Sequence, residues 1–196
     1  MTPILEGAKI RLEPMTMAHL ARLEAVAFDD RIWRLTTHRV KTSDDLKQWM
    51  ENALSLEAAG TVMPWVTILK AEDRVIGSTR FLDFNEAHKT TELGWSWLVP
   101  HFQGTGLNAE AKLLQLTYAF DELKLNRVAL KTHHQNLQSQ AAMRKIGAIE
   151  EGTFRNHMVM PDGSLRHSVW FSIIREDWPR VRSLLTARVQ AIQPSA

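Results

Sequence analysis

A strand, a glycine loop and a helix start follow one another between residues 91 and 123, and this segment constrains the fold more than any other. Thr91 to Val99 is rich in aromatic and branched side chains and stops before Pro100, which predicts a buried strand. The loop from Gln103 to Asn108 contains two glycines and leads into apolar residues spaced three or four apart, which predicts a helix. These apolar residues are Leu113, Leu116, Phe120 and Leu123.

The loop from Gln103 to Asn108 suits a phosphate group. Glycines let successive N–H groups converge, and a helix start adds unpaired N–H groups and the positive end of its dipole. A turn that uses glycine only for its geometry is an equally good interpretation. A Walker loop would continue Gly106 with Lys and Ser or Thr, and the dinucleotide fingerprint would have glycine at Ala109. Neither nucleotide motif fits.

The composition limits the class of protein. The chain has 196 residues, enough for one core, and its contents of 44% apolar and 23% charged residues are typical of globular proteins. It has no cysteine, which excludes disulfides, zinc–thiolate sites and a cysteine nucleophile. No stretch is long enough to span a membrane, no basic region precedes an apolar run near the N-terminus, and the formal charge of +2 is spread along the chain. We expect a cytoplasmic protein that binds neither membranes nor nucleic acid.

The remaining elements predict one mixed sheet. Predicted strands cover residues 9–13, 65–70, 75–84, 91–99, 126–133, 148–158 and 165–174. Predicted helices begin after Thr16, at Thr42 or Ser43, after the glycine loop, at Asn136 and after Asp177. Residues 29–42 have no clean period and are expected to form a loop. A hairpin meander followed by a strand-helix-strand unit predicts an α/β fold with a twisted, mostly antiparallel sheet and helices on both faces.

This element order, β-α-α-β-β-β-α-β-α-β-β with a C-terminal helix and tail over residues 175–196, resembles the GNAT N-acetyltransferases. The loop Gln103-Gly-Thr-Gly106-Leu-Asn108 is similar to their acyl-CoA loop, Gln/Arg-x-x-Gly-x-Gly/Ala, except at Asn108. Five further motifs resemble the RimJ/RimL group: Thr-Glu92-Leu-Gly-Trp, Leu-Asn126-Arg-Val, Asn136-x-x-Ser139, Lys-Ile-Gly147-Ala and Glu150-Glu-Gly-Thr-Phe-Arg155. The resemblance extends from Gly7 to about Trp178 and implies a single GNAT domain, residues 1–196, with splayed central strands.

The resemblance implies a site for acetyl-CoA. The pantetheine arm would lie between the strand that ends at Leu98 and Val99, whose backbone would pair with the arm's amides, and the strand from Arg127 to His133. A backbone N–H at a bulge would face the thioester oxygen and act as an oxyanion hole. The backbone of the loop would bind the pyrophosphate through Gln103, Gly104, Thr105, Gly106, Leu107 and Asn108.

Asn136 and Ser139 lie one helical turn apart and have two interpretations. The residues alone favour a helix cap at Asn136 and a solvated first-turn residue at Ser139. The resemblance implies instead that Asn136 hydrogen-bonds the pantetheine arm and that Ser139 protonates the departing thiolate.

Glu92 is the predicted general base, directly or through water, because only a neutral amine can attack. It alternates with Gly94, Ser96 and Leu98 along one strand face, toward the expected thioester. An ordinary paired carboxylate is an equally good interpretation of Glu92. In some RimL-type enzymes a glutamate stands where this chain has Met158.

Trp33 and Arg80 are the predicted acceptor-binding residues, within a wider set of tryptophans and arginines suited to an amine that also bears a carboxylate or a ring. The set comprises Arg31, Trp33, Arg34, Trp49, Arg80, Trp95 and Trp97. The adjacent His133 and His134 would face opposite sides of a strand, and we assign no metal site.

These observations predict an acetyl-CoA-dependent N-acetyltransferase that works by direct attack of an amine. The acceptor would be a protein N-terminal α-amine or a small amine such as an amino acid. Two alternatives remain: a non-catalytic acyl-CoA-binding regulatory module, and a nucleotide-binding protein that uses the same glycine loop. The amphipathic C-terminal helix is a candidate interface for a homodimer.

Overall fold

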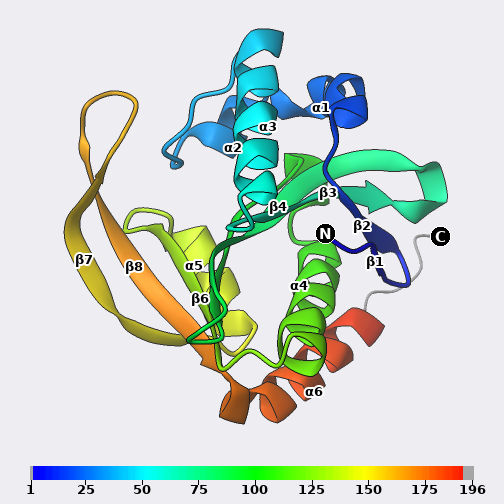
Figure 1. Ribbon diagram of the computed structural model, residues 1–196, viewed down its shortest axis with the longest axis vertical. Helices are drawn as coiled ribbons and strands as arrows, with labels where there is room; N and C mark the ends of the chain where they lie inside the picture. Colours follow the sequence, from blue (N-terminus) through cyan, green and yellow to red (C-terminus); the bar gives the residue numbers. More distant parts are fainter. Residues whose placement is uncertain (1, 192–196) are drawn as a thin grey trace.

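Within residues 2–191, which the computed structural model describes, eight strands form one open sheet (Figure 1). The strands are β1 (Leu5–Glu6), β2 (Ile10–Pro14), β3 (Met63–Leu69), β4 (Arg74–Asn85), β5 (Thr90–Leu98), β6 (Arg127–His133), β7 (Ile149–Val159) and β8 (Leu165–Ile174). Their order across the sheet is β1-β2-β3-β4-β5-β6-β8-β7. Neighbouring strands are antiparallel except β5 and β6, which are parallel. This is the mostly antiparallel mixed sheet that the sequence predicts.

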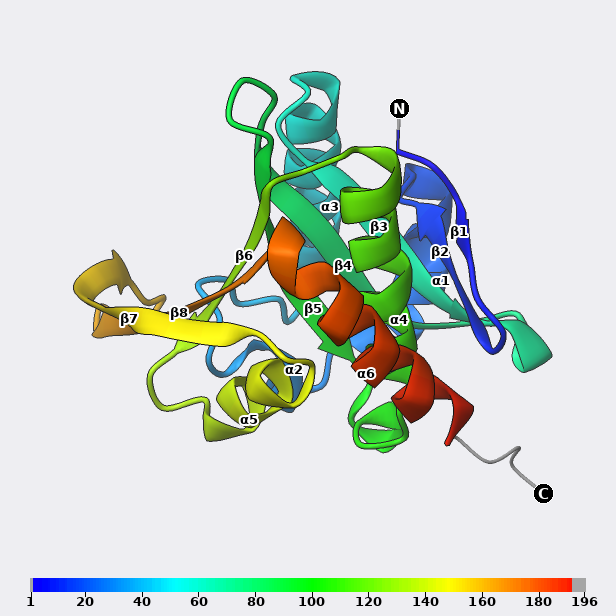
Figure 2. The same ribbon diagram turned by 90° about the horizontal axis from the view of Figure 1, so that it is seen from below.

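Helices cover both faces of the sheet (Figures 1 and 2). They are α1 (Leu20–Ala27), α2 (Asp30–Trp33), α3 (Ser43–Ala58), α4 (Leu107–Thr117), α5 (Leu137–Lys145) and α6 (Trp178–Gln190). Trp49 of α3 packs with Val66 of β3 in one apolar cluster, whereas Leu116 of α4 and Val181 of α6 pack with Trp65 of β3 in another. Because Trp65 and Val66 are adjacent on a strand, their side chains point to opposite faces of the sheet. The two apolar clusters therefore lie on opposite faces.

The predicted element order is confirmed, with two additions. β1 has two residues and α2 has four, so neither is long enough to show a period in the sequence. The predicted C-terminal helix forms as α6 with Pro179 in its first turn, whereas residues 192–196 of the predicted tail lie outside the described residues. No helix in residues 2–191 combines the length and the hydrophobicity needed to cross a lipid bilayer.

The central strands β5 and β6 splay apart. Their pairing comprises Thr90 with Arg127, Thr91 with Val128, and Glu92 with Ala129. Beyond this point β5 stays paired with β4 as far as Leu98, while β6 stays paired with β8 as far as His133. The two strands follow different partners, and a wedge opens between them as predicted.

A β-bulge interrupts β5 at the start of this wedge. From Gly94 to Trp97 β5 advances by three residues, while β4 advances by two, from Arg80 to Ser78. The extra residue is accommodated by Trp95, whose φ of 50° lies in the left-handed region. The bulge breaks the expected alternation of Glu92, Gly94, Ser96 and Leu98 along one face, because the side chains change sides beyond it.

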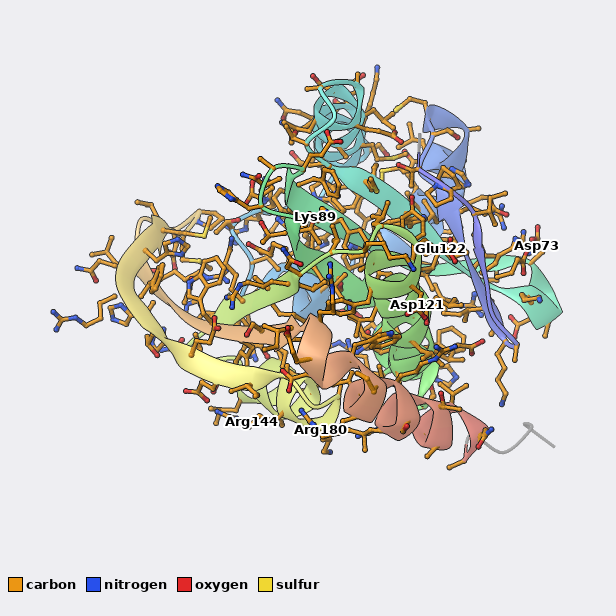
Figure 3. All side chains as sticks on the ribbon, turned by 60° about the horizontal axis from the view of Figure 1, so that its bottom comes forward. Asp73, Lys89, Asp121, Glu122, Arg144 and Arg180 are labelled. Carbon is orange, nitrogen blue, oxygen red and sulfur yellow. The ribbon has the colours of Figure 1, made fainter. Side chains whose placement is uncertain are left out.

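Helix α6 connects α5 to the end of α4. Trp178 Nε1 donates to Asp121 Oδ1 at 2.8 Å, in the π-helical turn Tyr118–Glu122 that follows α4. Arg180 donates to the carbonyl of Gly147, just beyond α5, at 3.1 Å. Figure 3 labels Asp121, in the turn after α4, and Arg180, on α6. α6 thereby fixes α5 and α4 on either side of the wedge.

Candidate active site

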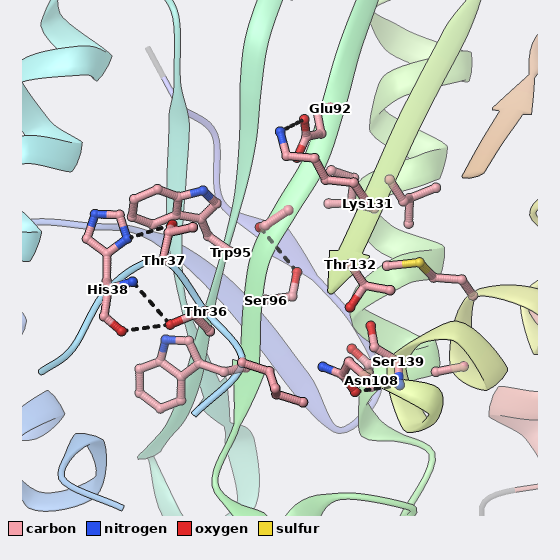
Figure 4. A pocket seen from close by; sticks show the side chains of 18 of the residues that line it. Thr36, Thr37, His38, Glu92, Trp95, Ser96, Asn108, Lys131, Thr132 and Ser139 are labelled. Atoms are coloured by element: carbon pink, nitrogen blue, oxygen red, sulfur yellow. Dashed lines mark hydrogen bonds and ion pairs between the residues drawn. The ribbon is translucent and has the colours of Figure 1, made fainter. Parts of the chain in front are cut away.

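A cavity of about 220 Å³ lies at the wedge between β5 and β6. Its walls comprise Trp33, residues 35–38, Trp49, residues 92–97 of β5, Asn108 and Lys112 of α4, residues 130–132 of β6, Asn136, Ser139 and neighbouring α5 residues, Met158 of β7 and Arg166 of β8. Figure 4 shows Glu92 and Lys131 at one end, Asn108 and Ser139 at the other, and His38 with Trp95 across from β6. The cavity therefore brings together the predicted base, part of the predicted cofactor site and the predicted acceptor side.

Glu92 is buried at the narrow end of the wedge, with 4% of its surface exposed. Its Oε2 accepts a hydrogen bond from Lys131 Nζ at 2.6 Å. Burial raises the pKa of Glu92, against the opposing effect of the Lys131 ammonium. A buried carboxylate with a raised pKa is a stronger base than an exposed one, and Lys131 holds it in one position.

The glycine loop has the backbone geometry of an anion site. Gly104 and Gly106 have φ values of 78° and 88°, which other residues adopt only under strain. A Cβ built at Gly104 meets no atom within 4 Å, so the space above the loop is open. α4 begins at Leu107, directly after Gly106. The loop thus presents the first N–H groups of α4 to an open space, as a phosphate requires.

The side chain of Gln103 joins the loop to its neighbours. Its Nε2 donates to the carbonyl of Leu98 at 3.1 Å, and its Oε1 accepts from Gln138 of α5 at 3.1 Å. Thr105 Oγ1 closes the loop by donating to the carbonyl of Phe102 at 2.7 Å. Gln103 therefore positions the loop through side-chain contacts to β5 and α5.

The backbone at the end of β5 is partly engaged within the protein. The N–H of Val99 donates to the carbonyl of Ile76 at 2.8 Å, and the carbonyl of Leu98 accepts from Gln103. The pairing of this segment with a pantetheine arm stays a prediction. The N–H of Val99 already donates to Ile76, so it is not free to bind the arm.

Asn136 caps α5, as the residues alone suggest. Its Oδ1 accepts from the N–H of Ser139 at 3.0 Å. Both side chains also line the cavity, where Ser139 is half-buried. Capping therefore holds the Ser139 hydroxyl at the cavity wall, and the two interpretations of this pair are compatible.

Lys112 of α4 is a buried cavity residue that the sequence interpretation did not identify. Its Nζ donates to Ser96 Oγ at 2.7 Å, and Thr79 Oγ1 and Gln115 Oε1 each lie 3.5 Å away. In the part of the chain that the structure describes, no carboxylate forms an ion pair with Lys112, and its hydrogen-bond partners are all neutral. Burial lowers the pKa of Lys112 to about 7. A partly neutral amine or an uncompensated ammonium thus lies directly beneath the β5 bulge.

The tryptophans form the acceptor side of the cavity, and Arg80 lies behind them. Trp33 is 6% exposed and lines the cavity, and its contact with an acceptor stays a prediction. The side chain of Arg80 is fully buried and does not line the cavity. Its guanidinium carbon lies 4.0 Å from the ring centroid of Trp49 and 4.5 Å from that of Trp95. Arg80 is thus placed to hold these two rings by cation–π contacts, and contact with the acceptor would be indirect.

Arg166 of β8 is, after Lys131 and Lys112, the third cavity cation that the sequence interpretation did not identify. It lines the cavity with 7% of its surface exposed, and its register partner Met158 lines the cavity beside it. Its Nε donates to Ser168 Oγ at 3.0 Å. His157 does not line the cavity, and its Nδ1 lies 2.9 Å from Ser168 Oγ.

A splayed strand pair, a β-bulge and a glycine loop at a helix start define the architecture of the GNAT acetyltransferases. Comparisons with known proteins assign this chain to the same family. The family profile described as an acetyltransferase (GNAT) domain matches residues 9–149. The chain belongs to the GNAT acetyltransferase family, which confirms the resemblance and places it among acyltransferases.

Three related proteins illustrate the extent of the similarity. A GCN5-related N-acetyltransferase from Brucella melitensis superposes with a TM-score of 0.87 at 26% identity, over 95% of this chain and 85% of that one. Mycobacterium smegmatis RimJ, in complex with CoA-disulfide, shares the fold with a TM-score of 0.78 at 20% identity, over 91% and 88% of the two chains. YdaF of Bacillus subtilis (strain 168) is 32% identical over 96 residues, so the match spans 49% of this chain and about half, 51%, of YdaF.

Proposed function

We propose that this protein transfers an acetyl group from acetyl-CoA to a primary amine by direct attack in a ternary complex. One observation carries the proposal: the open wedge between β5 and β6 contains a cavity that reaches Asn108, at the end of the glycine loop, and that holds the buried carboxylate of Glu92. Acetyl-CoA would supply the thioester, whose C–S bond breaks as the amine nitrogen forms an amide with the acetyl carbon.

The residues present suit such a co-substrate. The amides of Gly104 to Leu107 would bind the pyrophosphate, since both glycines have positive φ and open space lies above Gly104. The wedge beyond Glu92 and Ala129 offers strand edges to the pantetheine amides. Asn108, Asn136 and Ser139 line the cavity on the side nearest the loop.

Two side chains would move the protons of the reaction. Glu92 would take the proton that the attacking ammonium must lose, directly or through water. Ser139 would give its hydroxyl proton to the departing thiolate and recover one from solvent. The ion pair with Lys131 keeps the carboxylate of Glu92 fixed during the transfer.

Lys112 would support the oxyanion site. A backbone N–H at the bulge of Trp95 and Ser96 would face the thioester oxygen, which gains negative charge as the amine attacks. Lys112 lies beneath it and holds the Ser96 side chain at 2.7 Å. The hydrogen bond from Lys112 to Ser96 would hold the bulge in place. The positive charge of Lys112, when it is protonated, would stabilise the negative charge on that oxygen.

The acceptor would be a protein N-terminal α-amine or a small amine. YdaF is named for ribosomal N-acetylation, which supports the first class, and the small volume of the cavity supports the second. A homodimer through α6 and a cytoplasmic location stay predictions.

Thermal unfolding with excess acetyl-CoA, CoA, ATP or NAD tests the proposed co-substrate. A ligand at one hundred times its dissociation constant stabilises the native state by about 2.7 kcal/mol, which raises the midpoint by several degrees. We expect acetyl-CoA and CoA to raise it and ATP and NAD to leave it unchanged. A shift with ATP or NAD alone would overturn the proposal. Thiol release with an amine panel, with Glu92→Gln as the control, then separates an enzyme from a non-catalytic acyl-CoA-binding module.

A further inference from the structure

Arg166 presents an unpaired guanidinium to the cavity. The arginine ion pairs in residues 2–191 do not include Arg166, although the side chain is about nine-tenths buried. Its one hydrogen bond in that range uses Nε and the neutral hydroxyl of Ser168, which leaves both terminal nitrogens for another partner. Burial lowers the pKa of Arg166, and the charge of Glu92 opposes this effect. Since Glu92 already pairs with Lys131, the buried guanidinium has no carboxylate of its own.

The surroundings of Arg166 are positively charged. Glu92 is the one acidic residue that lines the cavity in the described chain, whereas Lys112, Lys131 and Arg166 are basic. Burial lowers the pKa of His157, with further effects from Lys131 and Arg166, and the pKa of His133 is lowered chiefly by burial too. Lys131 is paired with Glu92, so Arg166 leaves this corner with one uncompensated positive charge, and a buried charge of this kind favours an anionic ligand.

The phosphates of the co-substrate do not account for this charge. Gln103 to Leu107 of the pyrophosphate loop do not line the cavity, and the loop leads into α4. Arg166 belongs to β8 and lies beside Met158 of β7, on the other side of β6 from that loop. The pantetheine arm between loop and thioester carries no charge. An anion bound at Arg166 would therefore have to come from the acceptor.

A second cavity of about 410 Å³ adjoins the first and shares Trp33, Thr36 and His38 with it. Its charged lining residues are Arg31, Arg34 and Arg39 with Asp30 and Asp162. Arg31 forms an ion pair with Asp29 at 2.6 Å, so the positive and negative charges on this approach balance, and selection for an anion rests on Arg166.

We propose that the acceptor is an amine with a carboxylate a few bonds away, and that Arg166 binds this carboxylate while the amine lies beside Glu92. The guanidinium offers two parallel N–H donors, which match a carboxylate. This inference rests on the proposed transferase function and narrows its substrate class. Two sources present this chemistry: a free amino acid, and a peptide whose first residue is Asp or Glu.

Matched acceptor pairs test the inference by thiol release from acetyl-CoA. One arm compares free amino acids with their α-amides, and the other compares peptides that begin with Asp or Glu with those that begin with Asn or Gln. We expect turnover to favour the acid in one arm, which identifies the source. We expect Arg166→Gln to raise the KM of that acid about 10- to 100-fold, with the KM of its neutral partner nearly unchanged. Arg166→Lys should recover part of the loss.

The control is Arg155→Gln, an exposed arginine on neighbouring β7 that lines neither cavity, and it should change neither KM. Equal use of acid and neutral partner, equal effects of Arg166→Gln on both, or turnover of no acid in either arm would overturn the inference. If one of these results is obtained and acetyl-CoA still raises the unfolding midpoint, the inference about Arg166 fails while the proposed co-substrate is retained. Loss of that shift in the wild-type protein points instead to failure of the proposed function.

Discussion

The carboxylate of Glu92 lies 2.6 Å from the ammonium of Lys131, where β5 and β6 stop pairing. Glu92 belongs to the last residue pair of the two strands, and Lys131 lies two residues beyond its partner Ala129. The ion pair thus closes the narrow end of the wedge. It satisfies a buried charge and at the same time aims a fixed carboxylate at the cavity.

Replacing Glu92 by Gln should lower kcat about 100- to 1000-fold, because the amine loses its proton acceptor. The midpoint shift with acetyl-CoA should not change. Since burial raises the pKa of Glu92, the wild-type rate should fall as pH drops through that raised value, and this acidic limb should disappear in the variant. Glu150→Gln, an exposed carboxylate paired with Arg144, is the matched control and should keep full activity. Equal turnover by Glu92→Gln would remove Glu92 from the mechanism.

Replacing Lys131 by Met should leave a buried, unpaired carboxylate and raise the pKa of Glu92 further. The expected loss of unfolding free energy at pH 7 is about 3 kcal/mol. The loss should shrink as pH falls toward the ordinary value of 4.5, since a protonated Glu92 needs no cation. Urea unfolding at pH 4 and pH 7 measures this, with exposed Lys145→Met as the control. The double variant Glu92→Gln with Lys131→Met should recover part of the loss, and a strictly additive cycle would contradict the coupling.

Elements with a clear period or cap were predictable from the sequence. Thr42 caps α3 through a hydrogen bond from Asp45 N–H at 3.2 Å, as Asp44 and Asp45 in the first turn suggest. The strand, glycine loop and helix around Gly106 form where expected, and β8 has the predicted bounds. These features depend on neighbours in the sequence, so local pattern is sufficient to find them.

Side-chain contacts that depend on the register of neighbouring strands, or on the β-bulge, were not predictable from the sequence. Lys131 follows the simple alternation of β6, and only the register of β6 against β5 shows that it meets Glu92. Arg166 similarly depends on the pairing of β8 with β7. Lys112 did leave a signal, because it lies four residues before buried Leu116 on the same side of α4. A lysine on an apolar helix face is a candidate site residue.

Replacing Lys112 by Met should stabilise the protein while it lowers turnover. The pKa of Lys112 is lowered from 10.5 to about 7, so the unfolded state binds more protons between those values and the lysine costs most stability below pH 7. We expect the variant to gain about 2 kcal/mol at pH 6 after loss of the Ser96 hydrogen bond, or about 4–8 °C in Tm. The gain should vanish as pH rises toward 10.

The activity of the Lys112 variants separates its two effects. kcat should fall about 10-fold in Lys112→Met, because the Ser96 side chain and the bulge lose their support. Lys112→Arg should keep more of the activity, since it can still donate to Ser96. A Tm of Lys112→Met that is unchanged or lower at pH 6 would show that the buried lysine carries no stability cost, and unchanged kcat would remove it from the oxyanion site.

Replacing Gly106 by Ala should weaken acetyl-CoA binding more than it weakens the fold. Gly106 has φ of 88° immediately before α4, and a left-handed alanine costs about 1–2 kcal/mol. Relief of that strain rotates the amides at the start of α4 away from the pyrophosphate, so the midpoint shift with acetyl-CoA should largely disappear. Gly163→Ala is the matched control, because Gly163 has φ of 82° in the β7–β8 turn and lies outside the cavity. Both variants should lose similar stability without ligand, and Gly163→Ala should keep the full acetyl-CoA shift. Equal shifts in the two variants would show that the loop amides do not bind the co-substrate.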